Sequence, residues 1–365
     1  MYSSHDGKRL AMFWNPIGNK AVRCHLCQHR CRIPEGRMGV CSVRGNIDGR
    51  LYTFVYEKAV AVHVDPIEKK PLFHVFPGSR AFSVATVGCN FRCRFCQNWD
   101  ISQLNTFRKS SHDVKPSDFP GEYLPANRIV ELAVSYGCDS IAYTYTEPTV
   151  YYEYAYDTAK IAHENRILNL FITNGYITPE ALEHISPYLD AANVDLKGFH
   201  PEFYKKKIGA RLDRLLESLK AYKRLGIWLE VTTLVVPGYD DDPSNFYEIA
   251  RFIRDELGPE TPWHISRFFP NYKMKEVPST DLKILKKARK IGLEEGLRYV
   301  YSGNVPGDEG ENTYCYDCGK LLIRRFGFEV VENHLINGKC PRCSAPIDGI
   351  GMDHLQVGRS SYWLV

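Results

Sequence analysis

The sequence predicts an α/β fold, a partial (β/α)6 barrel of the TIM type between two cysteine-rich ends. Short apolar runs alternate with longer helical patterns across residues 76–305. Eleven of the twelve cysteines fall into three clusters, and the two outer clusters lie in loop-rich segments. We therefore expect a Cys-rich N-terminal domain over 1–75, the barrel over 76–305 and a four-Cys domain over 306–365. Cys138 stands alone, and we expect it in the core.

Length and composition narrow the class of protein. A chain of 365 residues exceeds the roughly 250 to 300 residues that one core usually supports. The net charge of +4 gives no strong field for nucleic acid. The first residues, "MYSSHDGKRLAMFW", lack the apolar run of a signal peptide, and no stretch approaches the ~18 apolar residues of a membrane span. We expect a cytoplasmic protein that binds neither nucleic acid nor membrane.

The strands and helices of the barrel can be placed in order. The predicted strands are 81–87, 140–145, 169–174, 191–196, 228–236 and 263–269. The predicted helices are 125–137, 148–165, 178–189, 209–226, 243–258 and 279–296. Pro148, Pro179 and Pro243 lie where helices commonly begin. Strands that alternate with helices imply a parallel sheet, with the chemistry at the carboxyl ends of the strands.

Three cysteines follow the first of these strands in the segment "GCNFRCRFC". They are Cys89, Cys93 and Cys96, with the aromatic Phe95 directly before the last one. Thiolates bind zinc and iron–sulfur clusters. A closed zinc site needs four protein ligands, and no fourth lies nearby in the sequence. A four-iron cluster held by three cysteines leaves one iron free for a substrate or cofactor.

This segment resembles the motif of the radical S-adenosylmethionine (SAM) enzymes, Cys-x3-Cys-x-aromatic-Cys. The resemblance implies that Cys89, Cys93 and Cys96 hold a catalytic [4Fe-4S] cluster and that Phe95 lies beside the cofactor. It also implies that the free iron binds the amino and carboxylate groups of SAM. One electron then cleaves SAM to a 5′-deoxyadenosyl radical, which abstracts hydrogen from an unidentified small molecule or peptide.

The next predicted strand ends in "YTYTEPT", residues 143–149. Many radical SAM enzymes carry Gly-Gly-Glu at this place to bind the SAM amino group. Glu147 matches the acid of that motif, while Tyr145 stands at a glycine position. The resemblance assigns Thr144, Tyr145 and Glu147 to SAM binding. The alternative is that Glu147 complements the dipole of the helix that follows.

Three later strand ends resemble the pyruvate formate-lyase activating enzyme group. "TNG" contributes Asn174, and "DLKG" contributes Asp195 and Lys197. By resemblance, these residues contact the ribose and carboxylate of SAM. Val236, in "VTTLVVPGYDDD", is expected beside the adenine. Taken alone, each of these segments is more typical of turn chemistry.

The full layout resembles the radical SAM enzymes of the AmmeMemoRadiSam system most closely. The segments "CQNWDIS", "YTYTEPT" and "DPIEKKPLFH", together with the cysteine-rich ends, carry this resemblance. It implies an association with Memo-like and Amme-type proteins. It also implies a low-potential electron donor of the flavodoxin or ferredoxin type.

The last cluster consists of two Cys-x2-Cys pairs separated by 21 residues, Cys315 with Cys318 and Cys340 with Cys343. This spacing is typical of a structural zinc ribbon. Rubredoxin-type iron fits the same four sulfurs. We expect zinc, or iron in its place, at this site.

The first cluster consists of Cys24, Cys27, Cys31 and Cys41. It fits either zinc or an auxiliary [4Fe-4S] cluster. The spacing slightly favours zinc in a scaffolding role. An auxiliary cluster would instead indicate electron transfer towards the active site.

Three hypotheses on function remain open at this point. The leading one is a radical SAM enzyme that modifies a small molecule or peptide. The second is an activating enzyme for a glycyl-radical enzyme. The third, of another class, is a non-catalytic metal-binding adaptor, which would tolerate the loss of Cys89.

Overall fold

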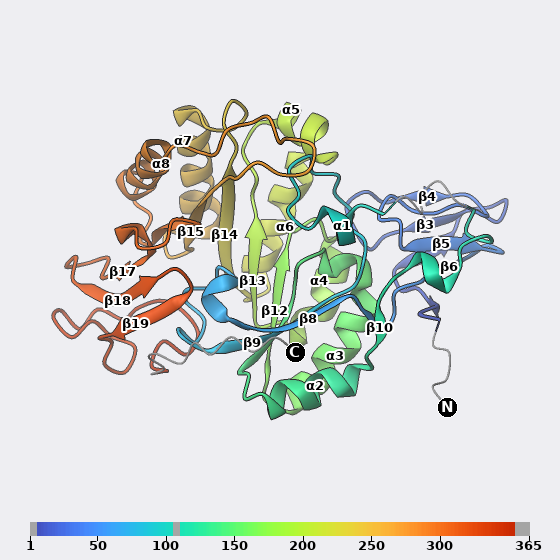
Figure 1. Ribbon diagram of the computed structural model, residues 1–365, viewed down its shortest axis with the longest axis horizontal. Helices are drawn as coiled ribbons and strands as arrows, with labels where there is room; N and C mark the ends of the chain where they lie inside the picture. The colour runs from blue at the N-terminus through green and yellow to red at the C-terminus, as the bar shows by residue number, and fades with distance from the viewer. Residues whose placement is uncertain (1–5, 105–109, 355–365) are drawn as a thin grey trace. The chain divides into compact units, whose positions relative to one another are not determined.

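The computed structural model describes residues 6–104 and 110–354 (Figure 1). These residues form two compact units. Unit 1 contains the described residues of 1–64 and 82–190, and unit 2 contains 65–81 and the described residues from 191 onwards. Each unit is described separately.

Unit 1 holds the first half of the α/β region. Its strand order is β8-β9-β11-β12, and β11 and β12 are parallel, with Ser140 opposite Leu168. The strands are β8 (Ala61–Pro66), β9 (Arg80–Ala85), β11 (Ser140–Tyr143) and β12 (Leu168–Thr173). The helices are α1 (Trp99–Ser102), α2 (Ala126–Ser135), α3 (Tyr152–Glu164) and α4 (Pro179–Ile185). Every residue of β11 is buried, as expected for a parallel strand covered on both faces.

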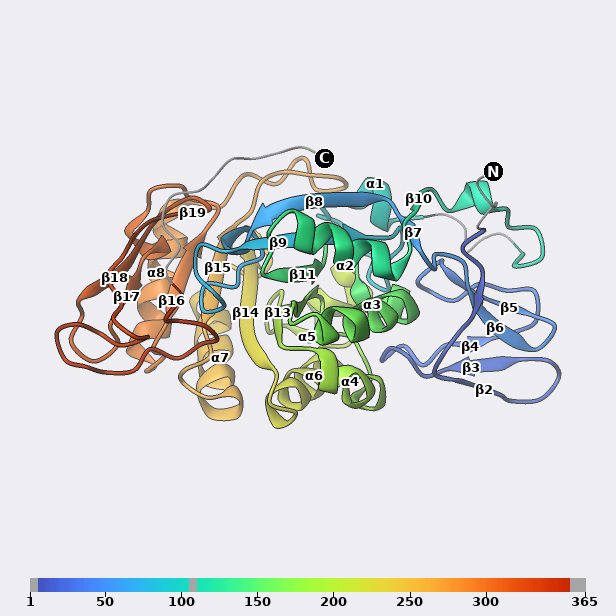
Figure 2. The ribbon, with the colours of Figure 1, turned by 90° about the horizontal axis from the view of Figure 1, so that it is seen from below.

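Unit 2 also consists of strands that alternate with helices. Its strand order is β13-β14-β15-β16, with parallel pairing throughout. The strands are β13 (Ala191–Asp195), β14 (Trp228–Val235), β15 (Trp263–Arg267) and β16 (Val300–Gly303). The helices are α5 (Pro201–Phe203), α6 (Leu212–Arg224), α7 (Pro243–Phe252) and α8 (Leu282–Glu294). Helix α8 packs against β15 and β16 (Figure 2).

The fold is therefore the predicted α/β partial barrel. Each of the six predicted strands overlaps an observed one, and each predicted helix overlaps a helical segment. Pro148, Pro179 and Pro243 occupy the first positions of a 3-10 turn (Pro148–Tyr151), of α4 and of α7. Cys138 is buried, as predicted. Strands β8 and β16 were not predicted, because one carries a mixed pattern and the other has only four residues.

The N-terminal segment forms short antiparallel strands in place of long regular elements (Figure 2). One sheet has the order β1-β6-β5 and a second has the order β2-β3-β4. The strands are β1 (Arg9–Leu10), β2 (Trp14–Pro16), β3 (Val22–Cys24), β4 (Arg32–Ile33), β5 (Arg44–Ile47) and β6 (Arg50–Thr53). A further pair joins β7 (Lys58–Ala59) to β10 (Glu122–Tyr123). The turn between β3 and β4 carries Cys27 and Cys31.

The C-terminal segment forms a three-stranded antiparallel sheet in the order β17-β18-β19. Its strands are β17 (Thr313–Tyr314), β18 (Leu321–Phe326) and β19 (Glu329–Asn333). Apolar residues of this sheet, such as Leu322 and Val330, share one buried cluster with Phe73, Tyr299 and Tyr301. None of the helices in the described ranges is long and apolar enough to cross a membrane.

A buried polar network ties segment 65–81 to the strands of unit 2. The carboxylate of Glu230, on β14, accepts hydrogen bonds from the backbone N–H groups of Phe73 (3.0 Å) and His74 (2.8 Å). It also lies 2.6 Å from the ring nitrogen Nε2 of His264. These partners lower the pKa of Glu230 against the opposing effect of burial, so the carboxylate stays ionised.

Candidate metal and cofactor sites

The loop of Cys89, Cys93 and Cys96 follows β9 directly. It begins at Gly88, whose φ of 100° suits glycine. A Cβ atom at this position would lie 2.5 Å from Val43, so a larger residue would clash. Helix α1 closes the loop, because the N–H of Gly88 donates to the carbonyl of Ile101 (2.9 Å).

Hydrogen-bond donors surround the sulfur atoms of this loop. The backbone N–H of Phe91 lies 3.3 Å from Cys89 Sγ, and Asn174 Nδ2 lies 3.7 Å from the same sulfur. Cys96 Sγ lies 3.2 Å from the hydroxyl of Ser102. Burial raises the pKa of Cys89 well above its usual range, and the nearby Glu147 raises it further. The donors around these sulfurs suit the negative charge of metal-bound thiolates.

The loop also fits an iron–sulfur cluster by two other observations. Asn90 Nδ2 is buried and has no hydrogen-bond partner among the described residues, so one donor is left for an acceptor such as sulfide. The three sulfurs are not among the ligand atoms that gather within 4.8 Å in the described part of the chain. A single ion needs such a compact set, whereas a cluster binds each sulfur through a different iron. Phe95, expected beside the cofactor, is buried.

Glu147 lies at the end of β11 and is buried. Its Oε1 accepts hydrogen bonds from the N–H and hydroxyl of Thr149 (3.0 and 2.5 Å) and from the hydroxyl of Thr173 (2.8 Å). Its Oε2 accepts from the N–H of Asn174 (2.8 Å). Burial raises its pKa, and these donors oppose the shift. Glu147 thus caps the turn that follows and leaves Oε2 with room for one more donor.

Tyr145 has the backbone conformation of a glycine. Its φ is 61°, in the left-handed region that a bulky residue rarely adopts. Asn98 Nδ2 donates to its carbonyl (2.8 Å), which ties this strand end to the segment just after Cys96. Thr144, one residue earlier, is buried, and its N–H donates to the carbonyl of Val84 (3.1 Å).

Asn174 connects Glu147 to the cysteine loop. Its Nδ2 donates to Asn90 Oδ1 (2.7 Å) and approaches Cys89 Sγ, while its Oδ1 accepts from the N–H of Tyr176 (3.0 Å). Unit 1 therefore brings the three cysteines, Glu147 and Asn174 together. The amide of Asn174 faces the loop through these contacts.

Unit 2 holds the remaining predicted residues at two strand ends. Lys197 Nζ donates to Asp195 Oδ2 (2.7 Å), so these two residues pair with each other. The N–H of Lys197 donates to the hydroxyl of Tyr204 (2.8 Å), which fixes the backbone after β13. Val236 directly follows β14 and is fully buried, and its N–H donates to Asp240 Oδ1.

Two polar side chains near these strand ends were not selected from the sequence. Asp240 Oδ2 and Thr232 Oγ1 are buried without a hydrogen-bond partner in the described ranges. Burial raises the pKa of Asp240 well above its usual range. Asp240 belongs to "PGYDDD", and three consecutive acidic residues are typical of an exposed turn. The burial of Asp240 could therefore not be predicted from the sequence. Both atoms are free to bind a polar ligand beside Asp195 and Lys197.

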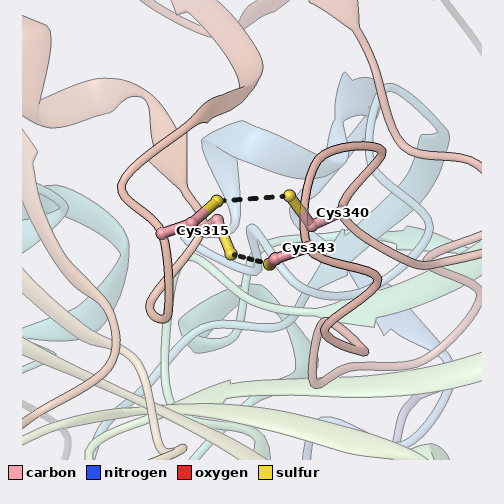
Figure 3. Close-up of side chains that lie close together, drawn as sticks. Cys315, Cys340 and Cys343 are labelled. Carbon is pink, nitrogen blue, oxygen red and sulfur yellow. Dashed lines mark hydrogen bonds between the residues drawn. The ribbon is translucent and has the colours of Figure 1, made fainter.

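The C-terminal quartet has the geometry of a site for one metal ion. Cys315 Sγ lies 3.5 Å from Cys343 Sγ, and Cys318 Sγ lies 3.6 Å from Cys340 Sγ (Figure 3). In the described part of the chain, this quartet alone gathers three or more possible ligand atoms within 4.8 Å. Tetrahedral zinc with bonds of about 2.3 Å places sulfurs about 3.8 Å apart, so the quartet fits it closely. Against the effect of burial, the N–H groups of Cys343 and Arg342 lower the pKa of Cys340 to about 6.

The N-terminal quartet is arranged differently. Cys24 and Cys41 are buried and Cys27 and Cys31 are half-buried, and all four line one cavity. No three of their sulfurs lie within 4.8 Å of one another. The four sulfurs therefore do not form the compact set that the C-terminal quartet forms.

Three comparisons place this chain among known proteins. Residues 83–253 match the model of the Radical SAM superfamily. The uncharacterized protein MJ0808 of Methanocaldococcus jannaschii is 48% identical over 93% of this chain and 99% of its own length. The pyruvate formate-lyase 1-activating enzyme of Escherichia coli is 24% identical over 49% of this chain and 70% of its own length.

A further match is a solved structure of low sequence identity. The structure of Streptococcus suis SuiB bound to S-adenosylmethionine has a TM-score of 0.46 at 15% identity. The match covers 65% of this chain and 53% of SuiB. The family model spans the cysteine loop and the strand ends of Glu147, Asn174, Asp195 and Val236. The chain is therefore an enzyme of the radical SAM superfamily, similar to the pyruvate formate-lyase activating enzymes.

Proposed function

We propose that Cys89, Cys93 and Cys96 hold a [4Fe-4S] cluster that binds SAM and acts on a small molecule or peptide. When bound, the cluster supplies the electron that cleaves SAM reductively to the 5′-deoxyadenosyl radical. The observation that carries this proposal is the contact chain from Glu147 through Asn174 to Cys89. It links the cysteine loop to two strand ends that carry the predicted cofactor residues.

The residues of the chain have distinct roles in this proposal. Asn174 donates towards Cys89 Sγ, and a donor to a cluster sulfur stabilises the more negative state. Glu147 holds the N–H of Asn174 and offers the spare capacity of Oε2 to the SAM amino group. The positive φ of Tyr145 turns its backbone as a glycine would, which supports the same role for this strand end. Thr144 and Phe95 enclose the site as buried neighbours.

The residues of unit 2 have polar groups suited to SAM. Lys197 forms an ion pair with Asp195 when no ligand is bound. The SAM carboxylate competes for the Lys197 ammonium, and Asp195 can then accept a hydrogen bond from a ribose hydroxyl. The unpartnered oxygens of Asp240 and Thr232 are further polar groups for the ribose. Val236 supplies an apolar contact for adenine.

A second candidate is an activating enzyme for a glycyl-radical enzyme. The name of the Escherichia coli relative supports it, as does a putative glycyl-radical enzyme activating enzyme of Methanocaldococcus jannaschii, 25% identical over 59% of this chain. Membership of an enzyme superfamily favours both catalytic candidates over the adaptor.

The other sites and partners complete the proposal. We assign zinc to the C-terminal quartet, because its sulfur spacing suits one tetrahedral ion. A flavodoxin or ferredoxin would supply the electron in the cytoplasm, whose reducing conditions keep thiols available as ligands. The resemblance also points to Memo-like and Amme-type proteins as associates.

The test uses protein purified without oxygen and reconstituted with iron and sulfide. After addition of dithionite and SAM, we expect 5′-deoxyadenosine from the wild type and none from Cys93→Ala. Cys138→Ala is the control, because this cysteine is buried outside all three clusters. Deoxyadenosine from Cys93→Ala at the wild-type rate would contradict the assignment of the cluster to this loop.

A further inference from the structure

The cavity between Cys24, Cys27, Cys31 and Cys41 is the feature that the proposed function leaves unused. Its volume is about 20 Å³. Leu26, Ile33 and Val150 complete an almost wholly apolar lining around the sulfurs. Thiols are soft ligands that bind zinc or iron–sulfur clusters, and this cavity gathers four of them.

The sulfur spacing separates this cavity from the C-terminal zinc site. The C-terminal sulfurs form a compact set, whereas neither the N-terminal quartet nor the Cys89 loop does so within the described residues. A polynuclear cluster accounts for the wider spacing, because each thiolate binds its own iron. The N-terminal quartet, like the radical SAM loop, thus lacks the compact sulfur set of the C-terminal quartet.

Arg44 provides an independent indication of a ligand in this cavity. Its side chain is only 2% exposed and lines the cavity. Its Nη atoms pair with Glu153 (3.0 and 3.3 Å) and with the carbonyl of Met12 (2.6 Å). Its Nε has no hydrogen-bond partner among the residues described. A buried N–H without a partner is destabilising, so an acceptor such as a thiolate or inorganic sulfide is expected there.

Direct contacts join this cavity to the Cys89 loop. Arg92 Nη1 donates to the carbonyl of Cys89 (2.8 Å). Its Nη2 donates to the carbonyl of Val40 and to the hydroxyl of Ser42 (2.9 Å), the two neighbours of Cys41. The guanidinium of Arg92 therefore forms hydrogen bonds with both cysteine loops.

Two further observations show that the N-terminal cysteine segment packs against the Cys89 loop. The ring nitrogen Nε2 of His29 lies 2.8 Å from the carbonyl of Asn90. A Cβ atom at Gly88 would lie 3.1 Å from the carbonyl of Cys41, which shows how closely the loops pack. Three separate contacts thus place the four-cysteine cavity against the loop of the proposed SAM cluster.

We propose that Cys24, Cys27, Cys31 and Cys41 hold a second four-iron cluster that relays electrons to the Cys89 loop. This inference rests on the proposed function. With all four irons bound to cysteine, the second cluster has no free position for a substrate, so its chemistry is electron transfer. A reduced flavodoxin or ferredoxin gives it one electron, and the same electron passes on to the cluster of the Cys89 loop. No bond or proton changes in this step.

The test compares metal content and Mössbauer spectra of the anaerobic, reconstituted full chain. We expect about eight irons and one zinc per wild-type chain, since two cubanes hold four irons each. Cys27→Ala/Cys31→Ala should lose about four irons and keep its zinc, and Cys93→Ala/Cys96→Ala should also lose about four. Cys138→Ala, the matched control, should lose none. Loss of a zinc instead of iron from the Cys27/Cys31 variant would overturn the proposal.

The Cys93/Cys96 variant keeps the test valid if the Cys27/Cys31 variant fails to fold, because it leaves the N-terminal ligands intact. Four irons with a fully cysteine-ligated Mössbauer signature in that variant support the second cluster, and none would refute it. If the proposed function alone is wrong, Cys93/Cys96 substitution loses no iron while Cys27/Cys31 substitution still loses four.

The relay is tested by reduction with reduced flavodoxin, followed by electron paramagnetic resonance. We expect the Cys89-loop cluster to be reduced at least about tenfold more slowly in Cys27→Ala/Cys31→Ala, and an unchanged rate would exclude the relay.

Discussion

At the residue scale, the carboxylate of Glu147 organises the proposed SAM half-site of unit 1. Glu147→Gln replaces one acceptor oxygen with an NH2 group. The oxygen that remains is best used by Thr149 and Thr173, so the NH2 group faces the N–H of Asn174. We expect a stability loss of about 1–3 kcal/mol and at least about tenfold weaker SAM binding. Thermal unfolding and equilibrium dialysis with SAM measure the two effects.

The matched control for this prediction is Glu180→Gln. Glu180 is exposed and pairs with Arg30 at 2.9 Å on the surface, where an ion pair contributes only about 0–1 kcal/mol. It should leave SAM binding unchanged. If Glu147→Gln binds SAM as tightly as the wild type, Glu147 is a helix cap alone and has no part in the cofactor site.

Individual residues also show where sequence reasoning ends. The three cysteines of the loop could be identified because their spacing is specific. The left-handed backbone of Tyr145 could not, because it is held by tertiary contacts such as those with Asn98 and His63. Asp240 and Arg44 went unnoticed for a related reason. A charged residue is usually exposed, and only tertiary packing shows that these two are buried with an unpartnered atom.

At the scale of elements, the proposed zinc at the C-terminal quartet predicts that the C-terminal sheet depends on this metal. Cys315 and Cys340 belong to the same buried cluster as Phe73, Tyr299 and Tyr301. Cys340→Ser removes one of four thiolates, so we expect the loss of about one zinc per chain and a β17–β19 segment that proteases cleave readily. Metal analysis and limited proteolysis check this. The iron content should stay unchanged, and retention of zinc with full protease resistance would contradict the assignment.

Helices were easier to predict than strands for physical reasons. Proline at the first helical position and an apolar stripe locate α4 and α7 from local sequence alone. Strand β16 has four residues, "VYSG", and forms because β15 offers it a parallel edge. The N-terminal strands of two to four residues are likewise held by their partners. Such short elements carry too little local signal to be seen before the fold is known.

At the scale of the whole molecule, stability should depend on pH through His74. Its Nδ1–H donates to the carbonyl of Asp348 and its Nε2 accepts from the hydroxyl of Tyr301, each at 2.6 Å. This neutral ring is fully buried, and burial lowers its pKa to about 4 from an ordinary value of 6.5. The nearby Glu230 opposes the shift, while Arg325 and His264 add to it.

The sign of the effect follows from this lowered pKa. Below pH 6.5 the His74 ring is protonated in the unfolded chain, whereas in the folded protein it stays neutral down to about pH 4. The stabilisation is therefore complete above pH 6.5 and is lost as the pH falls from 6.5 to 4, at about 1.4 kcal/mol per pH unit. Between pH 7.5 and 5.5 we expect the wild type to lose about 1.3 kcal/mol more than His74→Gln, measured by anaerobic unfolding. His112→Gln, at an exposed site, should behave like the wild type. Equal pH dependence in the wild type and His74→Gln would show that His74 takes up its proton within the folded protein.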